Sequence, residues 1–306
     1  MNDSQPVTVA ICTRNRGAAA LVAARSVLES RHPAFRLLVI DQSTNDESER
    51  ALDELKSDPR FTYQRTSSVG LSRARNIALR AADTEVVVFT DDDCEVVDGW
   101  LEAMQGIFDE FPSVAVAFCS VRAGPFDAAL GFVPAYECRG TRLIRGFVGK
   151  CRARGMGAGL AVRRRTVLER LGGFDEMLGA GATFPSCEDG DMAVRALLEG
   201  FDVCETDRTY VIHHGFRSWK EGRELGRRDF SGVGAAYAKP LRVGRWDFVP
   251  VPLYELAVQA FWPPVNDLLH LRFPRGAART LYFLHGFAQG LRAPLDPQNV
   301  VFRSDV

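Results

Sequence analysis

The first half of this chain alternates apolar, β-branched segments with segments of helical periodicity, and this alternation restricts the fold more than any other feature. Strands are predicted at residues 7–12, 35–40, 61–65, 86–90 and 114–121, and helices at residues 18–30, 45–57, 72–82 and 98–111. Strands connected through helices form right-handed βαβ units, which build a mostly parallel sheet with helices on its faces. We therefore expect an α/β, Rossmann-like fold. The expected helix caps are Thr44 or Asn45, Ser72 and Asp98.

The second half of the chain is less regular. From Gly124 to Gly157 the pattern fades into a stretch rich in Gly, Pro and Arg. Beyond it we expect a strand at residues 160–163, helices at 166–171 and 188–198, and two short strands at 202–206 and 209–213. From Ser218 onward the pattern is helical and is interrupted by prolines. These features divide the chain into an α/β domain, residues 1–217, and a helical region, residues 218–306.

Polar residues follow several of the predicted strands. Thr13 and Arg14 follow the first strand, Asp41 follows the second, and three consecutive aspartates, residues 91–93, follow the fourth. In open α/β sheets ligands bind beyond the carboxyl ends of the strands. We therefore expect these residues to share one edge of the sheet and to form the binding site.

Two kinds of chemistry fit these carboxylates. Adjacent carboxylates such as Asp91 and Asp93 need a counter-charge, and they suit a divalent ion such as Mg²⁺ or Mn²⁺ that also binds phosphates. The alternative for this segment is a solvated acidic loop. Asp41 suits a hydrogen bond to a ribose, as acidic residues do in other doubly wound folds, or an Asx turn into the next helix.

Further along the chain, three segments carry charged side chains at predicted helix or strand ends. Arg73 and Arg75 lie in the first turn of a helix, where their charge opposes the helix dipole. This position favours a ligand-facing role, and the alternative is an ordinary surface Arg. Residues 188–191 place three carboxylates at a helix start, where they either stabilise the helix or include a general base. The pair His213 and His214 offers a metal ligand or a buried, hydrogen-bonded imidazole, and the second alternative is favoured.

The overall composition limits the classes of binding partner and the cellular compartment that we expect. The net charge of −1 gives no argument for nucleic acid binding, although the Arg-rich segment at residues 139–165 suits phosphate groups. The seven cysteines are odd in number and form no CxxC pair, which favours a reducing cytoplasm over a disulfide framework. Residues 1–5 do not begin a signal peptide, and no apolar stretch reaches the ~20 residues that span a bilayer.

The order and spacing of four segments resemble the family 2 inverting glycosyltransferases, whose fold is called GT-A. The first segment is VAICTRNR, starting at Val9, and the second is VIDQSTND, starting at Val39. The third combines GLSRARN, starting at Gly70, with FTDDDC, starting at Phe89. The fourth combines LGGFDE, starting at Leu171, with EDGD, starting at Glu188. The resemblance covers about two thirds of the chain, from Val7 to Gly215. One departure is Gly159, which stands where members of the family often have Asn.

The resemblance implies a role for each matching residue. Thr13 and Asp41 would contact the base and ribose of a nucleotide-sugar donor, and Arg75 would lie close to them. Asp93 would be the main ligand of Mn²⁺ or Mg²⁺, and Asp189 would be the catalytic base. In full, the residues implied to bind the nucleotide are Thr13, Arg14, Asp41, Arg75, Asp91 and Asp92. Those implied to bind the metal are Asp93, Asp91 and His214, and those implied to lie on the acceptor side are Glu188 and Asp191.

The expected activity is transfer of a sugar, from a UDP-sugar by default or from a GDP- or dTDP-sugar, to a hydroxyl of a glycan or lipid-linked acceptor. Two alternatives remain: a nucleotidyltransferase that makes the sugar nucleotide, and a non-catalytic carbohydrate-binding relative. The aromatic and Arg-rich region after Trp246 is either a helical layer packed on the core or an amphipathic surface. The second alternative would place the protein peripherally at the inner face of the cell membrane.

Overall fold

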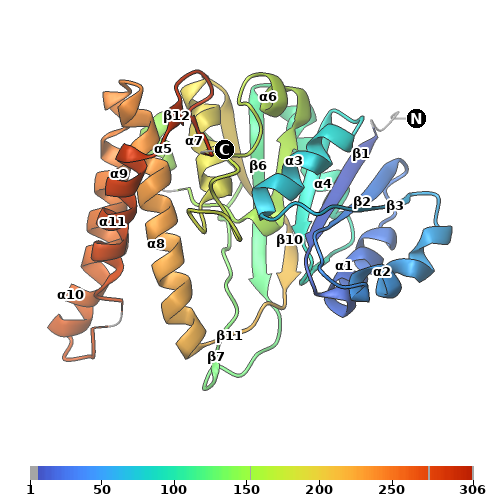
Figure 1. The fold of residues 1–306 in the computed structure, drawn as a ribbon, viewed down its shortest axis with the longest axis horizontal. Coiled ribbons are helices and arrows are strands. Elements are labelled where there is room, and N and C mark those ends of the chain that lie inside the picture. Colours follow the sequence, from blue (N-terminus) through green and yellow to red (C-terminus); the bar gives the residue numbers. More distant parts are fainter. Residues whose placement is uncertain (1–5, 152, 275, 305–306) are drawn as a thin grey trace.

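The computed structural model describes residues 6–151, 153–274 and 276–304, so the segment judged for a signal peptide, residues 1–5, lies outside the described part. Within it, a nine-stranded sheet has the order β3-β2-β1-β4-β9-β6-β10-β5, with β8 paired to β10 (Figure 1). The strands are β1 (Val7–Thr13), β2 (Phe35–Asp41), β3 (Phe61–Arg65), β4 (Val86–Asp91), β5 (Cys94–Val96), β6 (Val114–Ala123), β8 (Arg142–Ile144), β9 (Leu160–Arg163) and β10 (Asp202–His213).

The expected α/β fold is confirmed, with one antiparallel strand at the centre of the sheet. Strands β1 to β4 pair in parallel, whereas β9 runs antiparallel to both of its neighbours, β4 and β6. Helices connect the parallel strands: α1 (Gly17–Leu28), α2 (Glu47–Leu52) with the 3₁₀ turn η1 (Asp53–Ser57), and α3 (Leu71–Ala81). The parallel connections bring the carboxyl ends of β1, β2 and β4 to one edge, as the alternation of elements predicts.

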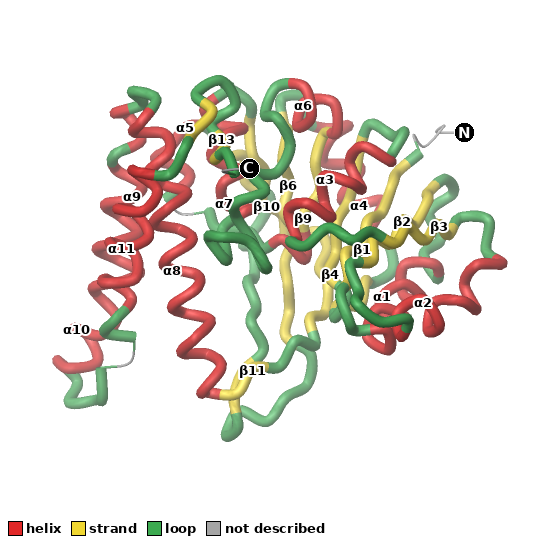
Figure 2. Tube along the Cα trace, viewed as in Figure 1, coloured by secondary structure: helices red, strands yellow, loops and turns green. Residues whose placement is uncertain are grey.

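Hydrophobic clusters cover both faces of the sheet. Strand β1 shows the two-residue alternation clearly, because Val9 and Ile11 pack in one cluster and Ala10 packs in the other. The first cluster lies under α1 and α4 (Trp100–Glu110). The second lies under α3, α7 (Glu188–Leu198) and the C-terminal helices (Figure 2). The sheet is therefore a buried central layer, and its edge carries the site.

Several local predictions were wrong for identifiable reasons. Strand β10 is one continuous strand and not two, because a register shift between Thr206 and Tyr210 absorbs the irregular residues. Helices α3 and α4 follow the left-handed glycines Gly70 and Gly99, so neither Ser72 nor Asp98 is a cap. Helix α2 likewise follows Asp46 and has no side-chain cap, so the expected cap at Thr44 or Asn45 was also wrong.

The segment between β6 and α7 contains short elements. These are β7 (Gly131–Phe132), which pairs with β11 (Arg217–Ser218), then α5 (Gly146–Lys150), the 3₁₀ turn η2 (Gly157–Gly159) and α6 (Arg164–Glu169). Glu205 on β10 holds much of this segment. Its buried carboxylate accepts hydrogen bonds from the backbone N–H groups of Arg154 and Gly155 at 2.8 and 2.9 Å. The loop thus has a fixed path despite its irregular sequence.

The C-terminal region forms a helical layer at one end of the sheet (Figure 1). It contains α8 (Trp219–Arg242), the turn η3 (Trp246–Phe248), α9 (Pro250–Tyr254), the π-helical turn η4 (Glu255–Phe261), α10 (Trp262–Leu269), α11 (Arg279–Arg292) and the short strands β12 (Leu295–Asp296) and β13 (Val301–Phe302). Helix α8 begins with a capping box between Ser218 and Glu221. Helices α8 and α11 approach closely because Gly234 and Gly286 face the partner backbone, where a Cβ atom would overlap it. In the described part of the chain, no helix is long and apolar enough to cross a membrane.

Candidate active site

A cavity of about 380 Å³ lies at the carboxyl edge of the sheet, which we call the strand-end cavity. Its lining includes Thr13 and Arg14 after β1, Gln42 after β2, and His213 at the end of β10. All three aspartates that follow β4, residues 91–93, also line it. The structure therefore brings together most of the residues predicted to share this edge.

Arg16 supplies the counter-charge for the aspartates, and the sequence analysis did not assign it a role. Its guanidinium lies 2.8 Å from Asp92 and 2.7 Å from Asp93. Thr13 donates a further hydrogen bond to Asp92 at 2.7 Å. Burial raises the pKa of Asp92 to about 6, against the opposing effect of Arg16. Because β1 and β4 are neighbours, an Arg in the turn after β1 is the residue that could have been expected to pair with the aspartates after β4.

His213, and not His214, lies beside the aspartates. Its Nε2 atom is 3.3 Å from Asp93, and its Nδ1 atom is 2.7 Å from the carbonyl oxygen of Pro134. His214 lies instead 2.6 Å from Glu95 and does not line the cavity. Successive residues of the strand β10 and its continuation point to opposite sides, so the structure places His213, rather than the predicted His214, beside Asp93.

The electrostatics of this pair are strongly coupled. Burial raises the pKa of Asp93, but the hydrogen bond and charge of His213, together with Arg16, outweigh it and hold that pKa well below its usual value. Burial lowers the pKa of His213, but the hydrogen bonds to Asp93 and to the Pro134 carbonyl oxygen, together with the negative charges of Asp93 and Asp91, outweigh burial and raise that pKa. Asp93 and His213 form, with the thiol of Cys94, a group whose ligand atoms lie within 4.8 Å of one another.

A second cavity, also of about 380 Å³, adjoins the first and lies between the sheet and the helical layer; we call it the helix-side cavity. Both cavities are lined by Leu71, Asp91, Ala180 and Arg217. The helix-side cavity also receives Glu188 and Asp189 from the first turn of α7. Asp91 therefore lies at the junction, with Asp93 on one side and Asp189 on the other.

Arg75 lies beneath the junction of the two cavities. Its side chain is only 2% exposed, and it reaches Glu188 at 3.0 Å and Asp91 at 3.5 Å. The guanidinium also lies 5.7 Å from the ring centroid of Phe89 and 5.5 Å from that of Phe174. Burial and the neighbouring Asp189 raise the pKa of Glu188 to about 7, although Arg75 opposes the shift. Arg75 therefore connects one carboxylate of each cavity.

Two of the glycines after the Arg-rich segment permit this arrangement. A Cβ atom on Gly157 would come within 2.5 Å of the Arg75 guanidinium. A Cβ atom on Gly159 would come within 2.8 Å of the Cys119 sulfur. The departure from the family pattern at Gly159 is therefore a packing requirement in this chain, and no side chain reaches the site from that position.

Other predicted site residues lie in different surroundings. Asp41 is fully buried and accepts hydrogen bonds from the backbone N–H of Ser43 at 2.8 Å and from the hydroxyl of Tyr63 at 2.7 Å. It does not line the strand-end cavity, whereas its neighbour Gln42 does. Arg73 pairs with Glu176 at 3.3 Å and lines neither cavity.

Asp191 does not reach the helix-side cavity, contrary to the acceptor role predicted for it. Its carboxylate is 1% exposed and lies 2.6 Å from Lys239 and 2.8 Å from Arg195. Residues two apart on an α-helix point to nearly opposite sides, so Asp189 borders the cavity while Asp191 faces the core. Asp191 is therefore part of a buried ion network.

The fold is the GT-A fold, which solved structures of glycosyltransferases share. The mannosyltransferase PcManGT from Pyrobaculum calidifontis, solved in complex with GDP-Man and Mn²⁺, is 20% identical, with a TM-score of 0.62 over 93% of this chain and 86% of that one. S. aureus TarS 1–349 is 14% identical, with a TM-score of 0.57 over 94% of this chain and 90% of that one.

The model of the family "Glycosyl transferase family 2" matches residues 8–172, which is more than half of the 306 residues, and the chain belongs to this family. An uncharacterized glycosyltransferase of Rickettsia conorii is 31% identical over 30% of this chain. The O-antigen biosynthesis protein RfbC of Myxococcus xanthus is 26% identical over 61% of this chain. The matched segments span 15% of the length of each of these two relatives.

Proposed function

We propose that this chain is a metal-dependent, inverting glycosyltransferase that moves a sugar from a nucleoside diphosphate carrier to an acceptor hydroxyl in glycan biosynthesis. The observation that carries the proposal is the meeting of two cavities at Asp91. The strand-end cavity, with Asp93 and His213, would hold the donor, and the helix-side cavity, with Asp189, would hold the acceptor. The helical region completes the acceptor side through Tyr237 and Glu255.

The side chains around Asp93 fit a divalent ion. Asp93 and His213 offer one carboxylate and one imidazole, both buried and close enough to share an ion. The Cys94 thiol is a poor ligand there because burial raises its pKa, so it stays protonated. A mixed oxygen and nitrogen set favours Mn²⁺ over Mg²⁺, which prefers oxygen ligands. The bound ion would offset the negative charge that develops on the departing diphosphate.

Other residues of the chain would accept the proton and contact the donor. Asp189 would accept the proton of the acceptor hydroxyl as the oxygen attacks the anomeric carbon from the face opposite the diphosphate, which inverts the configuration. Asp189 Oδ1 accepts the backbone N–H of Gly190 at 2.6 Å, which fixes the direction of the carboxylate. Arg217 lines both cavities and would lie beside the diphosphate. Thr13 and Arg14 would contact the nucleotide.

Donor recognition is tested by thermal shift with UDP, GDP and dTDP, each with and without Mn²⁺. We expect one nucleotide to raise the melting temperature, and to do so more strongly when Mn²⁺ is present. Asp93→Ala should abolish the Mn²⁺-dependent part of the shift, because it removes the main ligand. An equal shift of Asp93→Ala and wild type with Mn²⁺ would contradict the metal assignment.

Transfer is tested by release of the nucleoside diphosphate from the preferred nucleotide sugar. Loss of general-base assistance should lower turnover of Asp189→Asn by about 10²- to 10⁴-fold while nucleotide binding is retained. Asp109→Asn is the matched control, because Asp109 is an exposed carboxylate on α4 that lines neither cavity. Wild-type turnover of Asp189→Asn would refute the choice of base, and release of pyrophosphate from a nucleoside triphosphate would favour a nucleotidyltransferase.

A further inference from the structure

Large apolar side chains are exposed together around helix α10, although the helical layer that carries them is packed on the core. Leu271 is 98% exposed, Phe273 83% and Leu269 68%. The full set, which we call the apolar tip, is Phe261, Trp262, Leu268, Leu269, Leu271 and Phe273. Single exposed apolar side chains are common on protein surfaces, whereas several large ones within thirteen residues mark an interaction surface.

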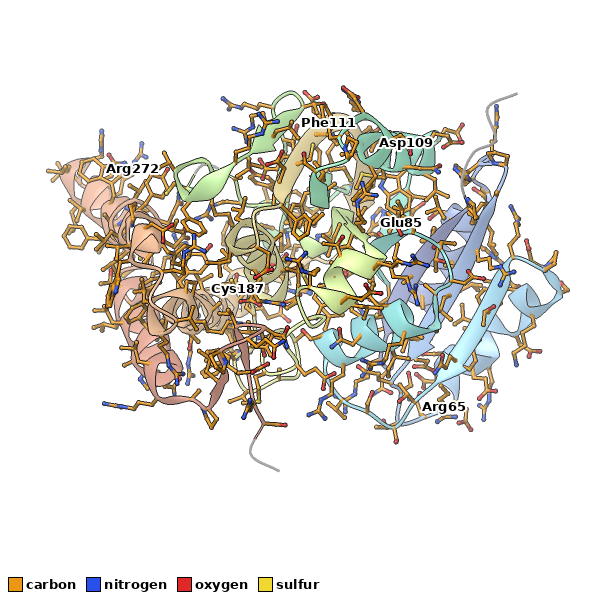
Figure 3. All side chains as sticks on the ribbon, turned by 90° about the horizontal axis from the view of Figure 1, so that it is seen from above. Arg65, Glu85, Asp109, Phe111, Cys187 and Arg272 are labelled. Carbon is orange, nitrogen blue, oxygen red and sulfur yellow. The ribbon has the colours of Figure 1, made fainter. Side chains whose placement is uncertain are left out.

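The apolar tip lies on the side of the molecule that carries the active site. In Figure 1, α10 and the turn that follows it project at the same end as β7 and β11, beyond the carboxyl ends of β6 and β10. In Figure 3, Arg272 lies at the outer end of the helical layer, far from Cys187, which lines the helix-side cavity. A flat surface that contacts the tip would therefore lie beneath the edge on which both cavities are built.

The same helical segment borders the cavity and carries apolar groups on its outer side. Val251 on α9 and Glu255 on η4 line the helix-side cavity, and Glu255 pairs with Arg154 at 2.6 Å. Between and just after these two residues, Leu253 is 58% exposed and Val258 is 40% exposed. One helical layer thus separates the acceptor side of the site from the outer apolar surface.

The charges around the tip favour one kind of partner. Arg272 stands between Leu271 and Phe273 and is itself exposed. Among the described residues no carboxylate lies within ion-pair distance of it. Asp267, the acidic residue of α10, is only partly exposed. Exposed Leu, Phe and Trp side chains with an unpaired Arg among them have the composition that inserts into the interface of an anionic bilayer.

We propose that the apolar tip binds the surface of an anionic lipid bilayer, so that the helix-side cavity opens close to the headgroups. Membrane binding does not depend on the proposed transfer reaction. The consequence for the acceptor does: if the chain transfers sugars as proposed, its acceptor is a hydroxyl on a lipid-linked molecule.

The test is flotation of the full chain with vesicles of phosphatidylcholine containing about a third phosphatidylglycerol, at low salt. The tip variant Leu269→Ser/Leu271→Ser/Phe273→Ser removes three exposed apolar groups, and we expect its partition coefficient to fall by about 100-fold. Val148→Ser/Trp246→Ser is the matched control, since both side chains are exposed, at 77% and 70%, on α5 and η3, away from the tip. It should float as the wild type does.

The contribution of charge is measured with Arg272→Gln and with vesicles of phosphatidylcholine alone. Each change should weaken wild-type binding, the first by about five-fold, and 0.5 M salt should reduce binding to anionic vesicles. Light scattering and nucleotide thermal shifts on the same samples check that the tip variant is folded. Absence of wild-type flotation, equal flotation of the tip variant, or a wild-type dimer that the tip variant abolishes would overturn the proposal. A failure of sugar transfer with intact flotation would refute only the proposed function.

Discussion

Replacing Lys239 should destabilise the protein more than any other single change of a charged residue on helix α8. Its ammonium group is fully buried and lies 2.6 Å from both Asp175 and Asp191. Asp191 also pairs with Arg195 at 2.8 Å, and Asp175 accepts the backbone N–H of Phe302 at 2.8 Å. Two carboxylates and two cations thus cancel in the interior, and they join α7, α8 and the C-terminal strand β13.

Lys239→Met keeps the length of the side chain and removes its charge. It leaves two buried carboxylates with Arg195 alone, which is an uncompensated negative charge. Removing one partner of a buried ion pair typically costs about 3–5 kcal/mol, and the exposures of 0% to 2% in this network give no reason to discount that value. Lys239→Met/Asp175→Asn restores neutrality, so we expect it to be more stable than the single variant by at least about 1 kcal/mol.

The assay is thermal unfolding followed by circular dichroism, together with unfolding in urea. Lys239→Met should lower the melting temperature by about 5–10 °C. The exposed Lys220 on the same helix provides the control Lys220→Met, which should change stability by no more than about 0.5 kcal/mol. If Lys239→Met were as stable as wild type, or if adding Asp175→Asn lowered stability further, the charge-balance reasoning would be refuted.

Two further predictions concern the site. Arg16→Gln removes the counter-charge of Asp92 and Asp93, so the pKa values of both carboxyl groups should rise. Isothermal titration calorimetry of this variant should then show weaker Mn²⁺-dependent nucleotide binding at pH 6 than at pH 8. Equal affinity at the two pH values would contradict this reasoning. For Glu188, the folded pKa of about 7 lies above the unfolded value near 4.5, so its stability contribution is present below pH 4.5 and is lost as pH rises to 7. Relative to Glu188→Gln, the wild type should lose on the order of 2–3 kcal/mol across that window, measured by urea unfolding at several pH values. A constant difference between the two proteins would show that this carboxylate is not perturbed.

The fold was predictable because its periodicities are local. The apolar segments and helices of the first 120 residues appear at almost the predicted positions, and βαβ handedness then fixes the parallel part of the sheet. What the periodicity could not provide is the placement of β9 between β4 and β6. That strand has only four residues, and its antiparallel pairing depends on the path of the irregular loop before it. The register shift within β10 was hidden for the same reason, since a bulge breaks a pattern without ending the strand.

The location of the site was predictable from the sequence, but the contacts between its side chains were less so. Asp91 and Asp93 lie at a strand end, and a general rule for α/β sheets assigns that position to ligands. The choice between His213 and His214 depended on the direction of one residue at the end of β10, and sequence gives no sign of it. Arg75 and Glu188 are separated by 113 positions in the chain, and only the tertiary fold brings them together.

The contacts of Arg75 suggest how the two cavities act together. One guanidinium group serves Asp91 in both cavities and Glu188 beside the proposed base, so neither carboxylate can move without changing the charge balance of the other. A donor that draws Asp91 toward a metal ion would leave Arg75 paired more closely with Glu188. That pairing would hold Glu188 ionised and fix the first turn of α7, which carries Asp189. Arg75→Lys should therefore impair turnover more than nucleotide binding, because a single ammonium cannot reach both carboxylates as the forked guanidinium does. Equal losses in kcat and in nucleotide affinity would show that Arg75 serves the donor alone.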